Sequence, residues 1–77
     1  NPVETRALSK IIRFLREHHG ITVLLIEHDM GMVMDISDDI IVLDHGDVIA
    51  QGKAEQIQHD EKVIAAYLGT SEDEVSL

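Results

Sequence analysis

Cysteine is absent from this 77-residue sequence, and so is any apolar run long enough to cross a bilayer. The first absence excludes a disulfide framework and a Cys-based zinc site as supports for a small core. The longest apolar run, residues 21–26, falls far short of the ~20 residues that a membrane-spanning helix needs. A domain of this size buries only roughly 60% of the surface that its unfolded form exposes. We therefore expect one small unit with a thin core.

Basic residues are also scarce. Six of them stand against fifteen acidic residues, which gives a formal net charge of -9. Such an excess repels phosphate backbones and anionic lipid head groups, so we expect no direct nucleic-acid partner. Glu72, Asp73 and Glu74 place part of the excess near the end of the chain. We expect residues 70–77 to form an acidic flexible tail.

The start of the chain has neither a methionine nor the basic stretch that opens a signal peptide. The missing methionine suggests a processed or truncated product. The lack of a signal-peptide pattern and of a long apolar run leads us to expect a protein that is soluble, or bound to a membrane through other subunits.

The first residues carry the signals of a helix start. Asn1 is a good N-cap residue, Pro2 suits the first helical position, and Glu4 can reach back to the cap. Apolar residues then recur at helical spacing, at Leu8, Ile11, Ile12 and Leu15. The pattern predicts a helix that ends near His19, with Gly20 as its stop.

Residues 21–26 are rich in β-branched side chains and apolar at both alternating sets of positions. This pattern is typical of a strand that is covered on both faces in a parallel sheet. Glu27, His28 and Asp29 follow at once, where open α/β sheets place their ligands. Asp29 is also suited to cap a short helix over residues 30–36.

The remaining chain predicts a hairpin and a last helix. Residues 40–44 and 47–51 are apolar-rich and separated by His45 and Gly46, which favours a tight β-turn. A short helical turn is expected over residues 54–58. Asp60 is expected to cap a last helix that Gly69 ends. The fold class is thus α/β, in the order helix, buried parallel-type strand, helix, hairpin, helix.

This order contains one parallel-type strand whose sheet partners are not in the chain. Residues 21–26 would then expose apolar surface and unpaired backbone groups. Two explanations stay open. The chain is a fragment whose missing N-terminal part completes the sheet, or it is a non-enzymatic acidic interaction module that docks its exposed strand against another protein.

The stretch Leu24-Leu25-Ile26-Glu27-His28-Asp29-Met30 resembles the switch-histidine loop of ABC-transporter ATPases. Residues 1–5 look like the end of the D-loop of that family, and residues 40–52 resemble its closing hairpin. Residues 63–69, Val-Ile-Ala-Ala-Tyr-Leu-Gly, are similar to the ending of the branched-chain amino acid subunits. The resemblance spans residues 1–69 and implies the C-terminal portion of a nucleotide-binding domain, with part of a P-loop NTPase fold.

The resemblance implies an intact subunit that couples ATP hydrolysis to import of branched-chain amino acids. It implies ATP and Mg²⁺ as cofactors, a second ATP-binding subunit and membrane-spanning permease subunits as partners, and a location on the cytoplasmic face of the membrane. The phosphate loop, the signature motif and the Walker B strand of the family are absent from this sequence. We therefore expect the 77-residue chain alone to bind no cofactor and to hydrolyse no ATP.

Two candidate site residues come from the resemblance. His28 matches the switch histidine, which would contact the γ-phosphate and help to hold the attacking water. Asn1 matches a D-loop position at the dimer interface, although many relatives have Asp there. A second departure is Lys53-Ala54-Glu55-Gln56, where many relatives have Thr-Pro-Glu-Glu. This change predicts a less well capped helix start.

Other polar residues allow both a functional and a purely structural interpretation. Glu27 and Asp29 could be acid/base groups or metal ligands, but a strand-end carboxylate and a helix cap are the simpler interpretation. The methionines at 30, 32 and 34 fit packing better than a soft-metal site. A basic strip on the first helix, made by Arg6, Lys10 and Arg13, fits a solvated face or a subunit contact. We expect no metal site formed by protein side chains.

Overall fold

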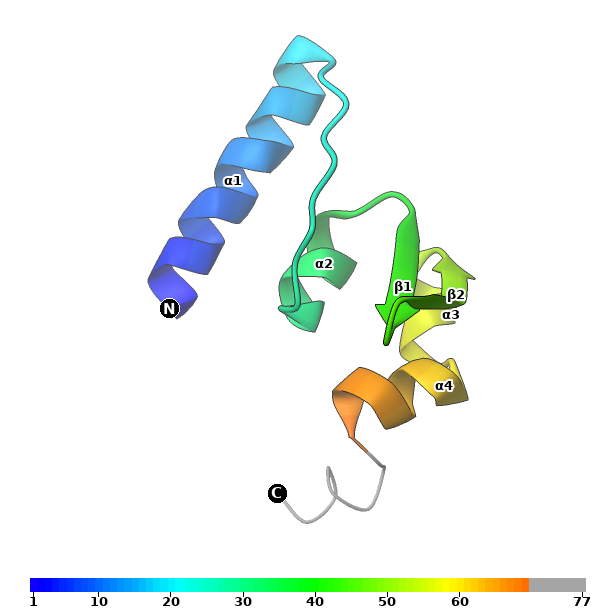
Figure 1. Ribbon diagram of the computed structural model, residues 1–77. Coiled ribbons are helices and arrows are strands. Elements are labelled where there is room, and N and C mark those ends of the chain that lie inside the picture. Colours follow the sequence, from blue (N-terminus) through cyan, green and yellow to red (C-terminus); the bar gives the residue numbers. More distant parts are fainter. Residues whose placement is uncertain (70–77) are drawn as a thin grey trace. The chain divides into compact units, whose positions relative to one another are not determined.

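The computed structural model describes residues 1–69 and divides after Ile36 into two compact units. The first unit is residues 1–36, and the second begins at Ser37 (Figure 1). The expected acidic tail at 70–77 lies outside the described residues. Within residues 1–69, none of the helices is long and apolar enough to span a membrane.

Helix α1, Pro2–His19, begins and ends as the sequence predicts. The Asn1 side-chain oxygen accepts hydrogen bonds from the backbone N–H groups of Val3, at 2.9 Å, and Glu4, at 3.1 Å. Gly20 ends the helix in the left-handed conformation, with φ of 62°. Glycine adopts this conformation without the steric cost that a β-carbon brings.

Residues 21–26 are not a β-strand, which corrects the sequence prediction. No backbone hydrogen bond joins residues 22–26 to another part of the described chain, and a strand exists only through such pairing. The segment is nevertheless extended (Figure 1). The exposure of its side chains alternates along the segment. Val23 and Leu25 pack on the core of the first unit, while Leu24 and Ile26 are each 89% exposed. One face is covered and the other is open, so the expected burial on both faces is also wrong for this chain.

Helix α2, Met30–Ile36, follows the extended segment and completes the first unit. The Asp29 carboxylate accepts a hydrogen bond from Met32 N–H at 3.0 Å, as expected of a cap. Met32 and Ile36 form the buried core with Ile12 of α1. The other apolar positions of α1 are less well covered, since Leu8 and Ile11 stay exposed.

Polar contacts also join α1 to α2. The Arg13 guanidinium donates to the Asp35 carboxylate at 2.9 Å and to the Asp35 carbonyl at 3.3 Å. Arg16 donates to the carbonyl of Ile36, the last residue of α2. Both arginines therefore satisfy acceptors at the C-terminal end of α2, where carbonyl groups lack helical partners and carry partial negative charge.

The second unit begins with the expected hairpin. Strands β1, Ile40–Asp44, and β2, Asp47–Gly52, pair antiparallel from Ile40 opposite Gly52 to Asp44 opposite Asp47. The turn needs two residues with positive φ, and His45 and Gly46 supply them at 50° and 84°. The register shifts between Val42 and Leu43, and the second strand runs one residue further than predicted.

Three short helical segments follow the hairpin, namely α3, Ala54–Gln58, α4, Glu61–Val63, and the π-helix η1, Ile64–Leu68. The Asp60 carboxylate caps α4 by accepting from Lys62 and Val63 N–H. The expected last helix thus exists, but it changes to π geometry after Val63 and ends at Gly69.

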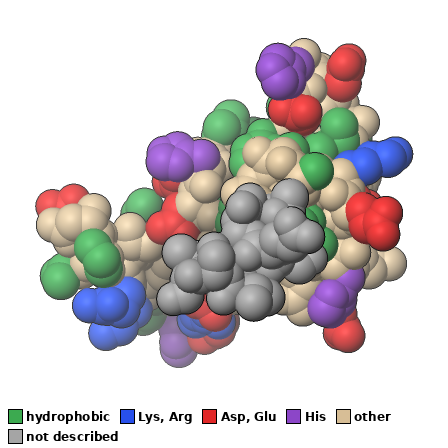
Figure 2. Space-filling model, turned by 90° about the horizontal axis from the view of Figure 1, so that it is seen from below, with side chains coloured by type: hydrophobic (Ala, Val, Ile, Leu, Met, Phe, Trp, Pro, Cys, Tyr) green, Lys and Arg blue, Asp and Glu red, His purple; other side chains and the backbone are tan. Residues whose placement is uncertain are grey.

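The Lys53 side chain does not cap α3, as the sequence predicts, but other contacts hold the start of this helix. The Gln56 side-chain oxygen accepts from the Lys53 backbone N–H at 3.0 Å, and the Lys53 ammonium lies 2.8 Å from the Asp39 carboxylate. Ile57 and Val63 are fully buried, and the hairpin residues Ile40 and Val42 are buried as well. Charged side chains lie on the outer surface (Figure 2). The architecture is therefore mixed helices with a two-stranded antiparallel sheet.

Candidate functional site

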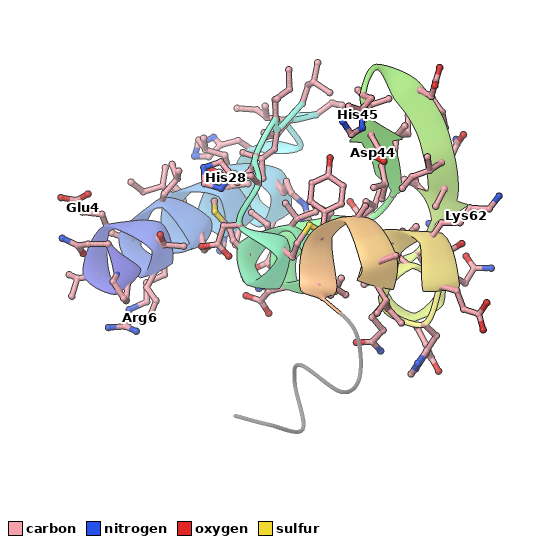
Figure 3. The ribbon with its side chains drawn as sticks, turned by 60° about the horizontal axis from the view of Figure 1, so that its bottom comes forward. Glu4, Arg6, His28, Asp44, His45 and Lys62 are labelled. Atoms are coloured by element: carbon pink, nitrogen blue, oxygen red, sulfur yellow. The ribbon has the colours of Figure 1, made fainter. Side chains whose placement is uncertain are left out.

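The candidate site is the turn between the extended segment and α2, which carries His28 (Figure 3). The imidazole is 95% exposed. An exposed imidazole whose ring nitrogens reach solvent can donate a hydrogen bond to an anionic oxygen. The structure therefore leaves His28 open to a ligand, and its phosphate-sensing role stays a prediction.

The Glu27 side chain forms hydrogen bonds within this turn. Its Oε1 atom accepts hydrogen bonds from the backbone N–H groups of His28, at 2.9 Å, and Asp29, at 3.3 Å. The same oxygen lies 3.6 Å from Nε2 of His28, while the Glu27 side chain is only 26% exposed. Sequence reasoning treated Glu27 as a strand-end carboxylate. Its three contacts through one oxygen were not foreseen, because they depend on the backbone path of the turn.

Asp29 and the methionines have structural contacts. Asp29 caps α2, as its sequence position predicts. Met32 is in the buried core, and Met30 and Met34 are half-buried. Among residues 1–69, no three His, Cys, Asp or Glu side chains are grouped closely enough to hold a metal ion.

Asn1 lies at an open hollow of about 370 Å³ that Asp29 also lines. Pro2, Thr5 and Arg6 complete the lining. The fold therefore brings the start of α1 close to the turn after residue 26, although His28 itself does not line the hollow. The Asn1 side-chain oxygen is engaged with the amides of α1, so its observed contacts are those of a helix cap.

The basic strip expected on α1 separates into different environments. Arg13 is bound to Asp35, whereas Arg6 contributes to the hollow beside Asn1. Sequence reasoning grouped these arginines by helical spacing and did not single out Arg6. The four-residue spacing between Pro2 and Arg6 would have placed them on the same side of α1.

The arrangement presents the His28 side chain as a potential hydrogen-bond donor on an exposed turn. In the described residues, no serine, threonine or carboxylate is hydrogen-bonded to the imidazole as a nucleophile or general base would be. His28 supplies one exposed donor on a turn that Glu27 holds.

Comparison with known proteins gives the site its context. A family model described as "Branched-chain amino acid ATP-binding cassette transporter" matches residues 48–73. The high-affinity branched-chain amino acid transport ATP-binding protein LivG of Escherichia coli (strain K12) is 54% identical over 69 residues, which is 90% of this chain and 27% of that protein. BraF of Pseudomonas aeruginosa, which carries the same description, is equally similar over the same shares of the two chains.

The similarity extends to other transport proteins. The zinc import ATP-binding protein ZnuC of Halorhodospira halophila is 38% identical over 66 residues, covering 82% of this chain and 25% of that protein. This chain spans about a quarter of the length of the curated relatives that it matches. No solved structure matches it significantly. The resemblance inferred from the sequence is confirmed, and the chain is similar to the C-terminal part of ATP-binding subunits of branched-chain amino acid ABC transporters.

Proposed function

We propose that this sequence is the C-terminal part of a subunit that hydrolyses ATP to drive import of branched-chain amino acids. The observation that carries the proposal is the 54% identity over 90% of the chain to LivG and BraF. Residues 1–69 would supply the end of the D-loop, the switch-histidine loop, the closing hairpin and the last helix of a P-loop NTPase domain. Residues 70–77 would follow as a tail.

In this proposal His28 contacts the γ-phosphate and helps to place the attacking water. The exposure of its imidazole supports this role, because a donor on an open turn is available to a phosphate oxygen. Asn1 would lie at the dimer interface with the second ATP-binding subunit. Its place beside the hollow with Arg6 and Asp29 agrees with an exposed contact position.

ATP and Mg²⁺ are the proposed cofactors of the intact subunit, and ATP supplies the phosphoryl group that is transferred to water. Of the residues described, His28 has the donor chemistry that fits a phosphate oxygen. The described residues bring together no ligand set for Mg²⁺, so the metal ligands would come from the missing N-terminal part. The 77-residue chain alone would be inactive, because positioning groups act together in phosphoryl transfer.

The proposed partners are the missing N-terminal part of the same subunit, a second ATP-binding subunit and transmembrane permease subunits. The subunit would be held at the cytoplasmic face of the membrane through the permeases. The open face of residues 21–26 supports the first partnership. Leu24 and Ile26 present apolar side chains, and the backbone beside them has no hydrogen-bonding partner among residues 1–69.

The test is a chimera in which the matched stretch of this chain replaces its 69-residue counterpart in E. coli LivG. The chimera is assembled with the permease subunits in vesicles, and ATP hydrolysis and leucine uptake are measured. We expect both activities, and we expect His28→Ala to lower kcat by about 10²-fold, which is typical for loss of one donor to developing charge. An assembled chimera without hydrolysis would refute the proposal. ATP hydrolysis without uptake of leucine, isoleucine or valine would refute only the proposal that branched-chain amino acids are the transported substrates.

The comparisons do not favour the alternative of an acidic interaction module. Both LivG and BraF are described as transport ATP-binding proteins, and the match covers nine tenths of this chain. The open edge at residues 21–26, which suggested docking on another protein, is equally well explained by a missing part of the same subunit.

A further inference from the structure

One carboxylate oxygen holds the turn that carries His28. Oε1 of Glu27 accepts from the backbone N–H groups of His28 and Asp29 and lies 3.6 Å from Nε2 of the imidazole. Hydrogen bonds to an ionised acceptor are stronger than those between neutral groups. The two amide contacts therefore fix this oxygen relative to the backbone from which the imidazole projects.

The two neighbouring side chains differ sharply in exposure. The Glu27 side chain is 26% exposed, and the His28 side chain is 95% exposed. A partly sheltered carboxylate keeps its contacts better than a fully solvated one, because water competes less for its oxygens. The arrangement thus combines a fixed negative group with a free imidazole.

We propose that Glu27 is a positioning residue for His28, an inference that rests on the proposed ATPase function. Its Oε1 atom orders the His28 and Asp29 amides and so sets where the imidazole emerges from the turn. The same oxygen lies opposite Nε2 of the imidazole. At 3.6 Å it is too distant for a good hydrogen bond, so the imidazole stays free to turn its N–H toward a phosphate oxygen.

The hydrogen bonds distinguish Glu27 from a residue that only stabilises the fold. Asp29 performs the capping of α2 through Met32 N–H. Within residues 1–69, the hydrogen bonds of the Glu27 carboxylate go to the backbone of the turn itself and not to α1 or α2. Its loss should therefore alter the placement of His28 more than the stability of the unit.

A double-mutant cycle in the chimera tests this inference, with kcat and KM for ATP measured on the complex with permeases. We expect Glu27→Ala to lower kcat about tenfold, since small misplacements of catalytic groups are costly. In the His28→Ala background the same change should lower kcat by less than about twofold, because residues that act as a unit are not additive. Glu27→Gln keeps the Oε1 acceptor and should recover kcat to within about threefold of the parent.

Asp60→Ala is the matched control. Asp60 also accepts two backbone N–H groups through one oxygen, at 2.8 and 3.3 Å, but it lies in the second unit at the start of α4. Its loss should lower the melting temperature and leave kcat within about twofold in both backgrounds.

Equal losses from Glu27→Ala with and without His28 would overturn the positioning role, and so would a Glu27→Gln enzyme as slow as Glu27→Ala. If His28→Ala retains the full rate, the proposed role of His28 fails and the role of Glu27 fails with it. The two failures are distinguishable. The positioning role alone fails when His28→Ala lowers kcat but the Glu27 variants do not behave as expected, whereas the role of His28 fails when His28→Ala keeps the full kcat.

Discussion

Truncation of Leu24 to alanine should have almost no effect on the isolated chain and a large effect on the intact subunit. Full burial of a leucine side chain contributes about 1.5–3 kcal/mol relative to leaving it exposed. Leu24 is 89% exposed, so only about a tenth of that value, ~0.2–0.3 kcal/mol, is realised in the chain by itself. If the missing part of the subunit covers this face, Leu24→Ala should cost about 2–5 kcal/mol there, because a cavity is added to the lost transfer energy.

The measurement is guanidinium-induced unfolding of the 77-residue chain and of the chimeric subunit, each with and without Leu24→Ala. Leu25→Ala is the control, since Leu25 already packs on the core of the first unit and its truncation should destabilise both proteins. Ordinary surface substitutions change the free energy of unfolding by less than about 0.5 kcal/mol. A change that small for Leu24→Ala in the chimera would refute the idea that residues 21–26 become covered on both faces.

Three further outcomes are expected for the second unit. Asp60→Ala should lower the free energy of unfolding by about 1 kcal/mol through loss of the α4 cap, measured by denaturant titration, and an unchanged midpoint would contradict the capping role. Gly46→Ala should lower the free energy of unfolding by about 1–2 kcal/mol, because Gly46 has a φ of 84° that disfavours a β-carbon. Hydrogen exchange of the hairpin amides should then accelerate, and unaltered exchange would argue against this turn geometry. The hydrogen bond and the charge of Asp39 raise the pKa of the Lys53 ammonium above its ordinary value of 10.5. The stability that this pair contributes is present below pH 10.5 and is lost as pH rises through the higher folded pKa. NMR titration of Lys53 should show a lower pKa in Asp39→Asn, and an identical pKa would exclude the Lys53–Asp39 ion pair.

Local signals in the sequence predicted local structure well. The Asn1 cap, the Gly20 stop, the Asp29 cap and the His45-Gly46 turn all occur as expected. Each depends on residues a few positions apart, and the hydrogen bonds that they form are satisfied within one helix end or one turn. Such features need no information about the rest of a protein.

Features that depend on distant groups were not predicted. Residues 21–26 have the composition of a buried strand, yet strand formation requires a neighbour that the described chain does not provide. The π geometry of η1 has no clear signal in its alanine-rich sequence, and its Tyr67 hydroxyl donates to the Leu43 carbonyl of the hairpin. For the candidate site, the motif indicated His28, but the Glu27 contacts became visible only with the backbone path.

The open face of residues 21–26 also affects how the chain behaves at high concentration. A six-residue segment without charge or proline and rich in β-branched side chains has the composition of segments that stack into cross-β fibrils. The net charge of -9 keeps copies apart, and acidification weakens this repulsion by protonating carboxylates. Solubility of the chain by itself should therefore depend on pH and salt. A second polypeptide that covers residues 21–26 should remove this dependence, so we expect a higher soluble yield when the two are produced together.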